Sequence, residues 1–395
     1  MPKPLSSTTV AVVKATVPAL AEHGAAITAA MYARLFQDPE IRALFNHANQ
    51  GEDGHQVHAL AAAILAYARN IEDLSVLTPV VERIAQKHVG FHILPEHYPF
   101  VAEALLTAIQ DVLGDAATED ILTAWGEAYW FLADILKDRE AALRDQLNRA
   151  EGGWTGWRRF VVAEKIRESG QIMSFILRPE DGGVVLRHKA GQYLTLRLSN
   201  GMKRNYSISC ASNGQIFRIT VKQQADGKGG SRLLHESVQI GDVLECTPPS
   251  GDFFLPDHLE RPVILLSGGV GLTPMVAMAE AIAAEHPGAE AWFVYGTQNA
   301  SAHALGPQIA AAARVSGMHV ATFYSDPRAQ DSPVRPGRIT MDWLKENTPL
   351  SGADIYLCGP RPFLTFFVSE LRKAGVPPER MHFEVFGPTD EQIAA

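Results

Sequence analysis

Ile84-Ala-Gln-Lys-His88-Val-Gly-Phe-His92-Ile-Leu-Pro95-Glu-His97-Tyr98 is the stretch around which the rest of the chain is organised. An apolar, helix-compatible run leads to His88, and Pro95 ends the helix. A histidine near the end of an apolar helix can bind a metal ion or a haem iron, but a satisfied core or surface histidine gives the same pattern. Because His88 and His92 are four residues apart, they would share one helix face. That spacing also allows a metal site with two histidine ligands.

The overall composition bounds the class of protein. Of 395 residues, 46% are hydrophobic and 20% are charged, which is ordinary for a globular chain. The net charge of −9 at pH 7 argues against nucleic acid or an anionic membrane as the main partner. No apolar run reaches the roughly 18–20 residues of a membrane span, and the first residues lack the apolar core of a secretory signal. We therefore expect a cytoplasmic protein with no membrane span.

Cysteine usage points the same way. The three cysteines, Cys210, Cys246 and Cys358, are far apart and form no Cys-x-x-Cys motif. This spacing suits free thiols in a reducing cytosol. It also excludes covalently attached haem of the c type, which needs Cys-x-x-Cys-His.

Changes in sequence texture predict three domains. Residues 1–150 are rich in Ala and Leu at helical spacing and are expected to be all-helical. Residues 151–260 carry short β-branched and aromatic runs, one of them Tyr206–Cys210, between turn signals, which predicts a small antiparallel barrel. From 261 to 395, apolar strands alternate with helices, which is typical of a doubly wound α/β domain.

A glycine-rich turn, Ser267-Gly268-Gly269-Val270-Gly271-Leu272-Thr273-Pro274, directly follows an apolar strand and opens a helix. Small residues let the backbone approach a pyrophosphate, and a helix N-terminus offers unpaired N–H groups. Pro274 stands where the usual Rossmann fingerprint has its third glycine, so the turn differs from that fingerprint. A plain tight turn between strand and helix is the alternative.

A second glycine motif, Cys358-Gly359-Pro360, closes another predicted strand at its carboxyl end. In open α/β sheets, ligands bind outside those ends. Glycine and proline at this point could shape a floor for a nicotinamide ring. A simple turn would also explain them.

In the predicted barrel, Arg204-Asn205-Tyr206-Ser207 follows Ala190-Gly191-Gln192-Tyr193. Arginine can bind a phosphate through two parallel hydrogen bonds. Tyr206, two residues on along a strand, shares the face of Arg204 and can stack on a flat ring, and the hydroxyl of Ser207 can hydrogen-bond a ring nitrogen. An exposed strand with a satisfied arginine is the alternative.

These motifs occur together in one order, with Glu384-Val-Phe386-Gly-Pro388 at the end of the chain. The barrel and α/β motifs resemble those of the ferredoxin-reductase-type flavoprotein family. With a helical N-terminal domain carrying Gln-Lys-His88, the whole chain resembles a flavohaemoglobin. The match covers nearly all of the 395 residues.

The resemblance implies a globin domain that holds noncovalent haem b through His88. The residues that match the proximal partners are Tyr98 and Glu140. A carboxylate that is hydrogen-bonded to the imidazole makes this ligand more electron-donating, which favours activation of O₂ over storage. Lys87 matches a lysine near the haem edge or the domain junction, although a solvated lysine would look the same.

On the distal side, the resemblance places Tyr32 and Gln56. Each of these side chains supplies a donor for bound oxygen. Phe45 matches the globin phenylalanine that packs on the haem.

The resemblance also implies FAD and NAD(P)H as cofactors of the two later domains. In the barrel it places Arg204 on the FAD phosphates, with Gly230 and Ser231 at a second phosphate contact. It places Tyr193 and Tyr206 near the flavin and Ser207 near its reactive nitrogen.

In the α/β domain the resemblance places Gly269, Gly271 and Thr273 on the dinucleotide. It places Cys358, Gly359 and Pro360 at the nicotinamide, and Phe386 over the flavin face where nicotinamide enters.

The implied activity is that of a nitric oxide dioxygenase. Hydride passes from NAD(P)H to FAD, electrons pass singly to haem iron, and ferrous haem binds O₂, which converts NO to nitrate. The alternatives are a gas- or lipid-binding haem sensor and an enzyme that reduces O₂ or alkyl hydroperoxides. O₂ and NO would be the partners of a chain that we expect to be a monomer.

The coenzyme preference has a weaker signal. Asp326 lies at the end of a predicted strand, where an NADPH 2′-phosphate would need positive charge, so the sequence favours NADH. Arg328, two residues on, leaves NADPH as the alternative.

Overall fold

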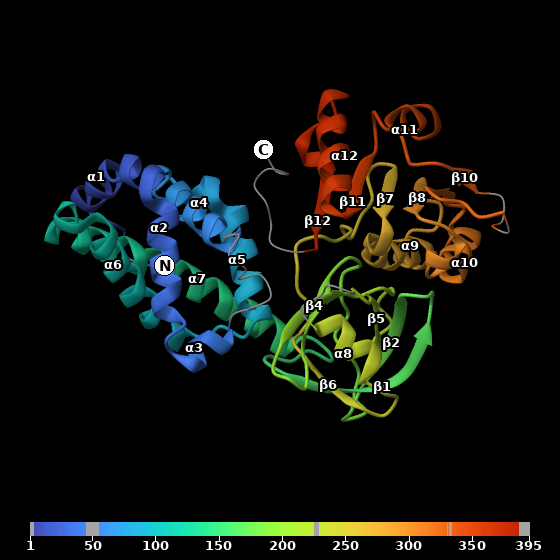
Figure 1. Cartoon of the computed structure of the whole chain (residues 1–395), viewed down its shortest axis with the longest axis horizontal. Coiled ribbons are helices and arrows are strands. Elements are labelled where there is room, and N and C mark those ends of the chain that lie inside the picture. Colours follow the sequence, from blue (N-terminus) through green and yellow to red (C-terminus); the bar gives the residue numbers. More distant parts are fainter. Residues whose placement is uncertain (1–3, 45–54, 225–228, 330, 332–333, 387–395) are drawn as a thin grey trace. The chain divides into compact units, whose positions relative to one another are not determined.

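The computed structural model describes residues 4–44, 55–224, 229–329, 331 and 334–386, without the side chains of residues 55 and 56. These residues form two compact units that divide between Arg149 and Ala150 (Figure 1). The first unit is all-helical. The second contains two sheets.

Two helices of the first unit begin at side-chain caps. The hydroxyl of Ser6 accepts from the backbone N–H of Thr9 at the start of the first helix, and the carboxylate of Asp38 accepts from the N–H groups of Glu40 and Ile41. The α-helices are α1 (Ser7–Ala15), α2 (Val17–Leu35), α3 (Pro39–Leu44), α4 (His55–Arg69), α5 (Thr78–Gly90), α6 (Tyr98–Leu113) and α7 (Glu119–Arg149). Short 3₁₀ turns lie at η2 (Leu74–Leu77), η3 (Pro95–His97) and η4 (Gly114–Ala116).

Two apolar clusters hold these helices together. The larger one includes Ile27 and Met31 of α2 together with Ile109 of α6. A smaller cluster joins Val89 of α5, Tyr98 of α6 and Leu136 of α7. The smaller cluster packs the end of α5 against α7, which is the region of the histidine-rich stretch.

The first sheet of the second unit is an antiparallel barrel. Its strands are β1 (Arg158–Arg167), β2 (Ile172–Pro179), β3 (Tyr193–Arg197), β4 (Lys203–Ser207), β5 (Phe217–Lys222) and β6 (Val243–Cys246), in the order β4-β3-β6-β1-β2-β5. A bridge between Ile208 and Ile219 joins the two outer strands and closes the sheet. The short helix α8 (Gly230–Glu236) follows β5.

The second sheet is parallel throughout, with strand order β10-β9-β8-β7-β11-β12. Its strands are β7 (Val263–Gly268), β8 (Ala291–Thr297), β9 (His319–Tyr324), β10 (Arg335–Pro336), β11 (Asp354–Gly359) and β12 (Met381–Val385). Its helices are α9 (Leu272–Glu285), α10 (Gly306–Ser316), α11 (Met341–Asn347) and α12 (Arg361–Lys373), with 3₁₀ turns η5 (Gly269–Gly271), η6 (Ala300–Ala302) and η7 (Pro378–Arg380). The strand order reverses between β7 and β11, and this switch point is where open α/β sheets bind ligands.

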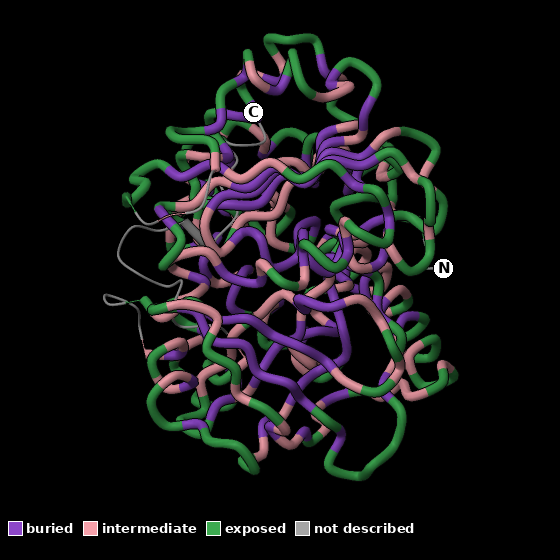
Figure 2. The backbone as a smooth tube through the Cα atoms, turned by 90° about the vertical axis from the view of Figure 1, so that its right-hand side faces the viewer, coloured by how far each residue is buried: buried purple, intermediate pink, exposed green. Residues whose placement is uncertain are grey.

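Each face of the parallel sheet is covered by its own pair of helices. Residues of α9 and α10 belong to one buried cluster and those of α11 and α12 to another. Strands β2, β5, β7, β8 and β11 consist mostly of buried residues, and Figure 2 draws such buried stretches of the chain in purple. The predicted order of an all-helical domain, an antiparallel barrel and a doubly wound α/β domain is therefore confirmed.

Some predicted details were wrong. The strand expected at Tyr206–Cys210 lies at Lys203–Ser207, because residues 203–207 pair with β3. Helix α8 was not predicted from the sequence. In the described part of the chain no single helix is long and apolar enough to cross a membrane, although α1 and α2 together, bent by 68°, meet the same length and composition criteria.

Candidate functional site

His88 lies in the last turn of α5, and hydrogen bonds at the helix end hold its backbone in place. The N–H of Ile93 donates to the carbonyl oxygen of His88 at 2.8 Å, and the N–H of His92 donates to that of Val89 at 3.1 Å. His92 has φ of 58°, so this is the Schellman motif that ends many helices. The sequence-based idea that His88 and His92 share one helix face is therefore wrong, because α5 stops before His92.

A buried carboxylate orients the His88 ring. Nδ1 of His88 lies 2.7 Å from Oε1 of Glu140 and 3.1 Å from the hydroxyl oxygen of Tyr98. The Tyr98 hydroxyl donates to the same Glu140 oxygen at 2.5 Å. The side chain of Glu140 is 0% exposed, so its oxygens need hydrogen-bond donors from the protein. The three side chains come from α5, α6 and α7.

Further contacts stabilise this cluster. Arg144 lies one turn after Glu140 on α7, with Nη2 3.5 Å from Oε2 of Glu140. It also donates to the carbonyl oxygen of Ile93, three residues after the end of α5. The hydroxyl of Tyr129 donates to the carbonyl oxygen of Tyr98 at 2.7 Å. Burial, and then the hydrogen bond to Glu140, raise the pKa of the Tyr98 phenol well above its usual range, so it stays a donor.

The residues at this point fit a haem. With Nδ1 facing Glu140, Nε2 is the ring nitrogen available to an iron, and a carboxylate on the far nitrogen is the usual second partner of a metal-binding histidine. Within the described residues no group of three or more His, Cys, Asp or Glu side chains is arranged to hold a metal ion. A single protein ligand would suit a haem iron, because the porphyrin supplies the other nitrogen ligands.

The other predicted haem residues are only partly described. Tyr32 is half-buried on α2, and its ring stacks on Phe36 with centroids 5.4 Å apart and planes at 19°. Gln56 lies in the first turn of α4, but its side chain is outside the described residues, as is Phe45 altogether. Lys87 is exposed beside His88. The structure thus brings His88, Tyr98 and Glu140 together.

In the barrel, the two predicted flavin segments are neighbouring strands. Tyr193 on β3 pairs directly with Ser207 on β4, and Leu196 pairs with Arg204. Arg204 and Tyr206 alternate with Asn205 and so share one face of β4. Gly251 packs against the ring of Tyr193, because a Cβ atom on Gly251 would lie 2.9 Å from Cε1 of Tyr193.

A glycine at the start of α8 lies against the predicted phosphate-binding arginine. A Cβ atom on Gly230 would be 3.0 Å from Cγ and 3.2 Å from Nε of Arg204. Ser231 follows, and its hydroxyl accepts from the N–H of Gln224 at 3.2 Å. The guanidinium of Arg204 lies beside the N-terminus of α8, where residue 230 has no side chain. Such a site fits a phosphate group, so the arrangement suits the pyrophosphate of FAD.

Burial shifts the pKa values of titratable groups on β3 and β4. It raises the pKa of Tyr206 to about 12 and also raises that of Tyr193. Burial and the nearby Arg197 lower the pKa of Lys203 to about 8. Burial lowers the pKa of Arg204 as well, which still leaves the guanidinium charged.

The two glycine motifs of the α/β domain meet at the switch point. A Cβ atom on Gly271 would lie 2.2 Å from the carbonyl oxygen of Cys358 and 2.6 Å from the backbone nitrogen of Gly359. The turn after β7 can therefore approach the end of β11 only because residue 271 is glycine. Gly269 has φ of 57°, which also favours glycine. This crevice is where the fold binds a dinucleotide.

The remaining predicted residues lie around the same edge. The hydroxyl of buried Thr273 donates to the carbonyl oxygen of Val270 at 3.1 Å and thus stabilises the turn. Pro360 is exposed and precedes α12. Val385 pairs with Gly359, so Phe386, which is 46% exposed, follows at the same edge.

Sequence reasoning missed several contacts. Arg144 could have been found, because Glu140 and Arg144 have the i,i+4 spacing of a helical ion pair. The contact of Gly251 with Tyr193 has no local signal, since the two residues are far apart in the sequence. The contact of Gly230 with Arg204 also depends on the fold.

Comparisons with known proteins agree with this geometry. Residues 28–136 match the family model described as "Globin", residues 159–255 match "Oxidoreductase FAD-binding domain", and residues 265–369 match "Oxidoreductase NAD-binding domain". A flavohemoprotein of Xylella fastidiosa strain 9a5c is 58% identical over 392 residues, which cover 98% of this chain and 98% of that protein.

Two solved structures are similar to the chain. The flavohemoglobin of Malassezia yamatoensis, solved with bound FAD and heme, is 27% identical with a TM-score of 0.85, and the match covers 98% of this chain and 100% of that one. The flavohem-like FAD/NAD binding domain of a nitric oxide dioxygenase from Vibrio cholerae O1 biovar El Tor is 37% identical with a TM-score of 0.54, covering 58% of this chain and 99% of that one. These findings confirm the resemblance drawn from the motifs. Because a relative with 58% identity matches nearly the full length of both proteins, this chain belongs to the flavohemoprotein family.

Proposed function

We propose that this flavohemoprotein is an NAD(P)H-dependent nitric oxide dioxygenase that converts NO and O₂ to nitrate. The observation that carries the proposal is the contact between the buried Glu140 carboxylate and Nδ1 of His88. The same chain also carries the residues that fit FAD and a dinucleotide. The similarity of the second unit to the domain of a nitric oxide dioxygenase supports it further.

When bound, FAD takes hydride from NAD(P)H and passes single electrons to the haem, which supplies the iron at which O₂ and NO react. The chain's own residues position these groups. We assign His88 as the iron ligand, with Glu140 and Tyr98 holding Nδ1 so that the ring keeps one orientation and one tautomer. The negative carboxylate makes the imidazole a stronger electron donor.

On the distal side we assign Tyr32 as the donor that holds oxygen. Its ring is braced by stacking on Phe36, which favours a fixed position of the hydroxyl. We assign Gln56 as a second donor and Phe45 as the residue that packs on the haem, as the family resemblance implies. Lys87, exposed beside His88, would lie at the haem edge.

In the second unit we assign Arg204, Gly230 and Ser231 to the FAD phosphates. The flavin would contact Tyr193, Tyr206 and Ser207.

The dinucleotide phosphates would be held by Gly269, Gly271 and Thr273. The nicotinamide would be supported by the Cys358-Gly359-Pro360 turn. Phe386 would cover the flavin face until nicotinamide displaces it.

We further propose NADH as the preferred coenzyme. Asp326 is exposed two residues after the end of β9, and its backbone N–H donates to the carbonyl oxygen of Gln298 at 2.9 Å. A carboxylate at this point would repel a 2′-phosphate.

Buried free thiols at Cys210, Cys246 and Cys358 favour a reducing compartment such as the cytoplasm. We also expect the protein to be a monomer.

Consumption of NO by the purified, haem- and FAD-loaded protein tests the function. With NADH and O₂ present we expect catalytic loss of NO and formation of nitrate. If NO loss needs no NADH, or if nitrate does not form, the proposal is wrong. A comparison of NADH with NADPH in the same assay tests the coenzyme assignment.

A further inference from the structure

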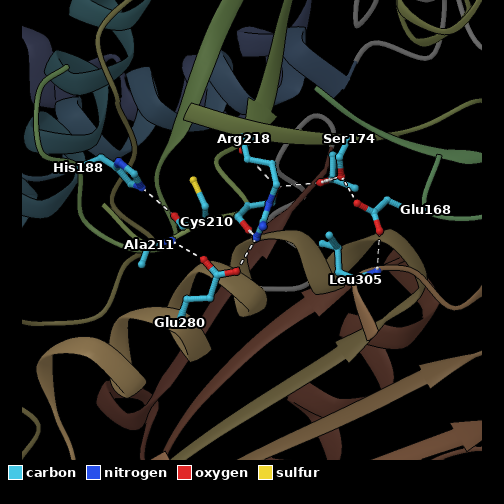
Figure 3. A network of polar contacts seen from close by, with 10 residues as sticks. Glu168, Ser174, His188, Cys210, Ala211, Arg218, Glu280 and Leu305 are labelled. Atoms are coloured by element: carbon cyan, nitrogen blue, oxygen red, sulfur yellow. Dashed lines mark hydrogen bonds and ion pairs between the residues drawn. The ribbon is translucent and has the colours of Figure 1, made fainter. Parts of the chain in front are cut away.

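Two carboxylates join the barrel to the α/β domain (Figure 3). Glu280 of α9 accepts from Nη2 of Arg218 on β5 at 2.7 Å and from the backbone N–H of Ala211 at 2.9 Å. Glu168, which follows β1, accepts from the backbone N–H of Leu305 before α10 at 3.3 Å. Each carboxylate therefore binds a donor of the other domain.

Buried hydroxyl groups connect the two contacts. The links run from Arg218 Nε to Ser209 Oγ at 3.3 Å, from Ser209 Oγ to Thr220 Oγ1 at 2.8 Å, from Thr220 Oγ1 to Ser174 Oγ at 2.8 Å, and from Ser174 Oγ to Glu168 Oε1 at 2.7 Å. Ser174 and Ser209 are 0% exposed. A continuous buried network of this kind resists rotation, because moving one member leaves others without partners.

Helix α9 also packs closely against the barrel backbone. Gly191 has φ of 113°, and a Cβ atom on it would lie 2.6 Å from Cε of Met278 on α9. One face of α9 thus contacts the segment that leads into Tyr193. Glu280, two residues after Met278, makes the polar contacts to Ala211 and Arg218.

The same helix begins at the dinucleotide-binding turn. Glu280 follows Leu272, the first residue of α9, by eight positions, which is roughly 12 Å along a helix that rises about 1.5 Å per residue. On the barrel side, Ala211 follows Ser207 by four residues. Helix α9 therefore begins at the predicted nicotinamide crevice and, through Glu280, contacts the backbone at Ala211, four residues after the predicted flavin residue Ser207.

We propose that Glu280 is a positioning residue for hydride transfer, which holds α9 at one distance and angle from the flavin through Arg218 and Ala211. This inference rests on the proposed function, in which NADH reduces FAD within this unit. Glu168 serves as the second attachment point, on α10. Hydride transfer needs the reacting atoms in a near-attack geometry, and a displacement of about 1 Å can cost on the order of a hundredfold in rate.

Glu280→Gln tests the role with little change in shape. A glutamine offers one acceptor oxygen and one NH₂ donor, so it can satisfy either Arg218 or Ala211 but not both. The matched control is Glu180→Gln, because the ion pair of Glu180 with Arg159 lies wholly within the barrel. Stopped-flow reduction of the flavin by NADH in the full-length holoprotein separates the hydride-transfer rate from the Kd of NADH. FAD content is measured on the same samples.

We expect the limiting rate of flavin reduction to fall about tenfold or more in Glu280→Gln, while the Kd of NADH, the FAD content and the Glu180→Gln control stay within about twofold of wild type. Glu168→Gln should slow the same step. An unchanged limiting rate in Glu280→Gln would overturn the proposal, and so would loss of FAD in proportion to the loss of rate. If NADH does not reduce the wild-type flavin, the proposed function itself is wrong, and this inference falls with it.

Discussion

Nδ1 of His88 lies 2.7 Å from Oε1 of Glu140, although 52 positions of sequence separate the two residues. The side chain of Glu140 is fully buried, and the Tyr98 hydroxyl donates to the same oxygen. Helices α5, α6 and α7 therefore meet at one carboxylate. This contact orients the histidine. In the assignment that we propose, Nε2 would bind the iron, and the carboxylate would tune how strongly the imidazole donates electrons.

Replacing Glu140 with glutamine tests the electronic role. The amide keeps an acceptor but loses the negative charge, so the imidazole donates less and the ferric state is less stabilised. We expect the haem midpoint potential to rise in Glu140→Gln. Redox titration followed by the haem absorption bands measures it.

The control for this prediction is Glu82→Gln. Glu82 pairs with Arg139 at 2.6 Å and so also joins α5 to α7. Its substitution should leave the haem potential near that of wild type. Equal potentials in Glu140→Gln and wild type would mean that Glu140 does not tune the ligand.

Tyr32→Phe tests the distal assignment. The change removes only the hydroxyl and keeps the ring that stacks on Phe36. A hydrogen bond to a charged group contributes about 1.5–3 kcal/mol, so we expect O₂ to leave the reduced protein roughly tenfold faster or more. Stopped-flow measurement of O₂ dissociation checks this. Tyr67→Phe is the control, because the Tyr67 hydroxyl donates to the carbonyl oxygen of Ala128. If both variants release O₂ at the wild-type rate, Tyr32 is not the distal donor.

Arg204→Ala tests the phosphate contact of FAD. Each charge-assisted hydrogen bond that is lost should weaken binding by about 1.5–3 kcal/mol. FAD affinity is measured by quenching of flavin fluorescence when apoprotein is titrated. The exposed Arg159, which pairs with Glu180 on the barrel surface, provides the control substitution Arg159→Ala. Unchanged affinity in Arg204→Ala would remove this residue from the FAD site.

The sequence predicted the three folds and the motifs because their signals are local. Apolar strands followed by Gly-rich turns indicate the carboxyl ends of parallel strands, as at Gly269–Gly271 and Cys358–Pro360. Helical periodicity and Pro95 placed the end of the helix near His88. The pairing of β3 with β4 moved one strand by three residues, since register depends on the partner strand.

Contacts between distant segments could not be predicted from these signals. The positions of Glu140 and Tyr98 came from family resemblance, because nothing near residue 140 indicates that it reaches His88. The left-handed conformation of His92 follows the end of α5, so His88 and His92 do not share the helix face that their spacing alone suggested. The network from Glu280 to Leu305 joins segments that are far apart in the sequence, and it becomes visible only when the barrel and the parallel sheet are packed together.

His188 should make the second unit sensitive to acid. Burial lowers its pKa from 6.5 to about 4, although the hydrogen bond of Nε2 to the carbonyl oxygen of Cys210 opposes this shift. Between these pH values the unfolded chain takes up a proton that the folded chain does not. Stability is therefore lost as the pH falls from about 6.5 to about 4, by up to about 3 kcal/mol at about 1.4 kcal/mol per pKa unit.

Release of FAD fluorescence on heating measures this effect between pH 7 and pH 4.5. We expect His188→Gln to be less stable than wild type at pH 7 but to lose less stability on acidification. His258→Gln, at an exposed histidine, should follow the wild-type pH profile. A parallel loss of stability in His188→Gln and wild type would show that His188 titrates normally.

The most direct test of the proposed function compares NO consumption by wild type and His88→Ala, both supplied with haem, FAD, NADH and O₂. We predict that wild type consumes NO in an NADH- and O₂-dependent reaction that yields nitrate. His88→Ala should lose haem and this activity but keep its FAD and its NADH-dependent reduction of ferricyanide, because the two cofactor sites lie in separate units. NO consumption by His88→Ala at the wild-type rate, or none by the fully loaded wild type, would contradict the account.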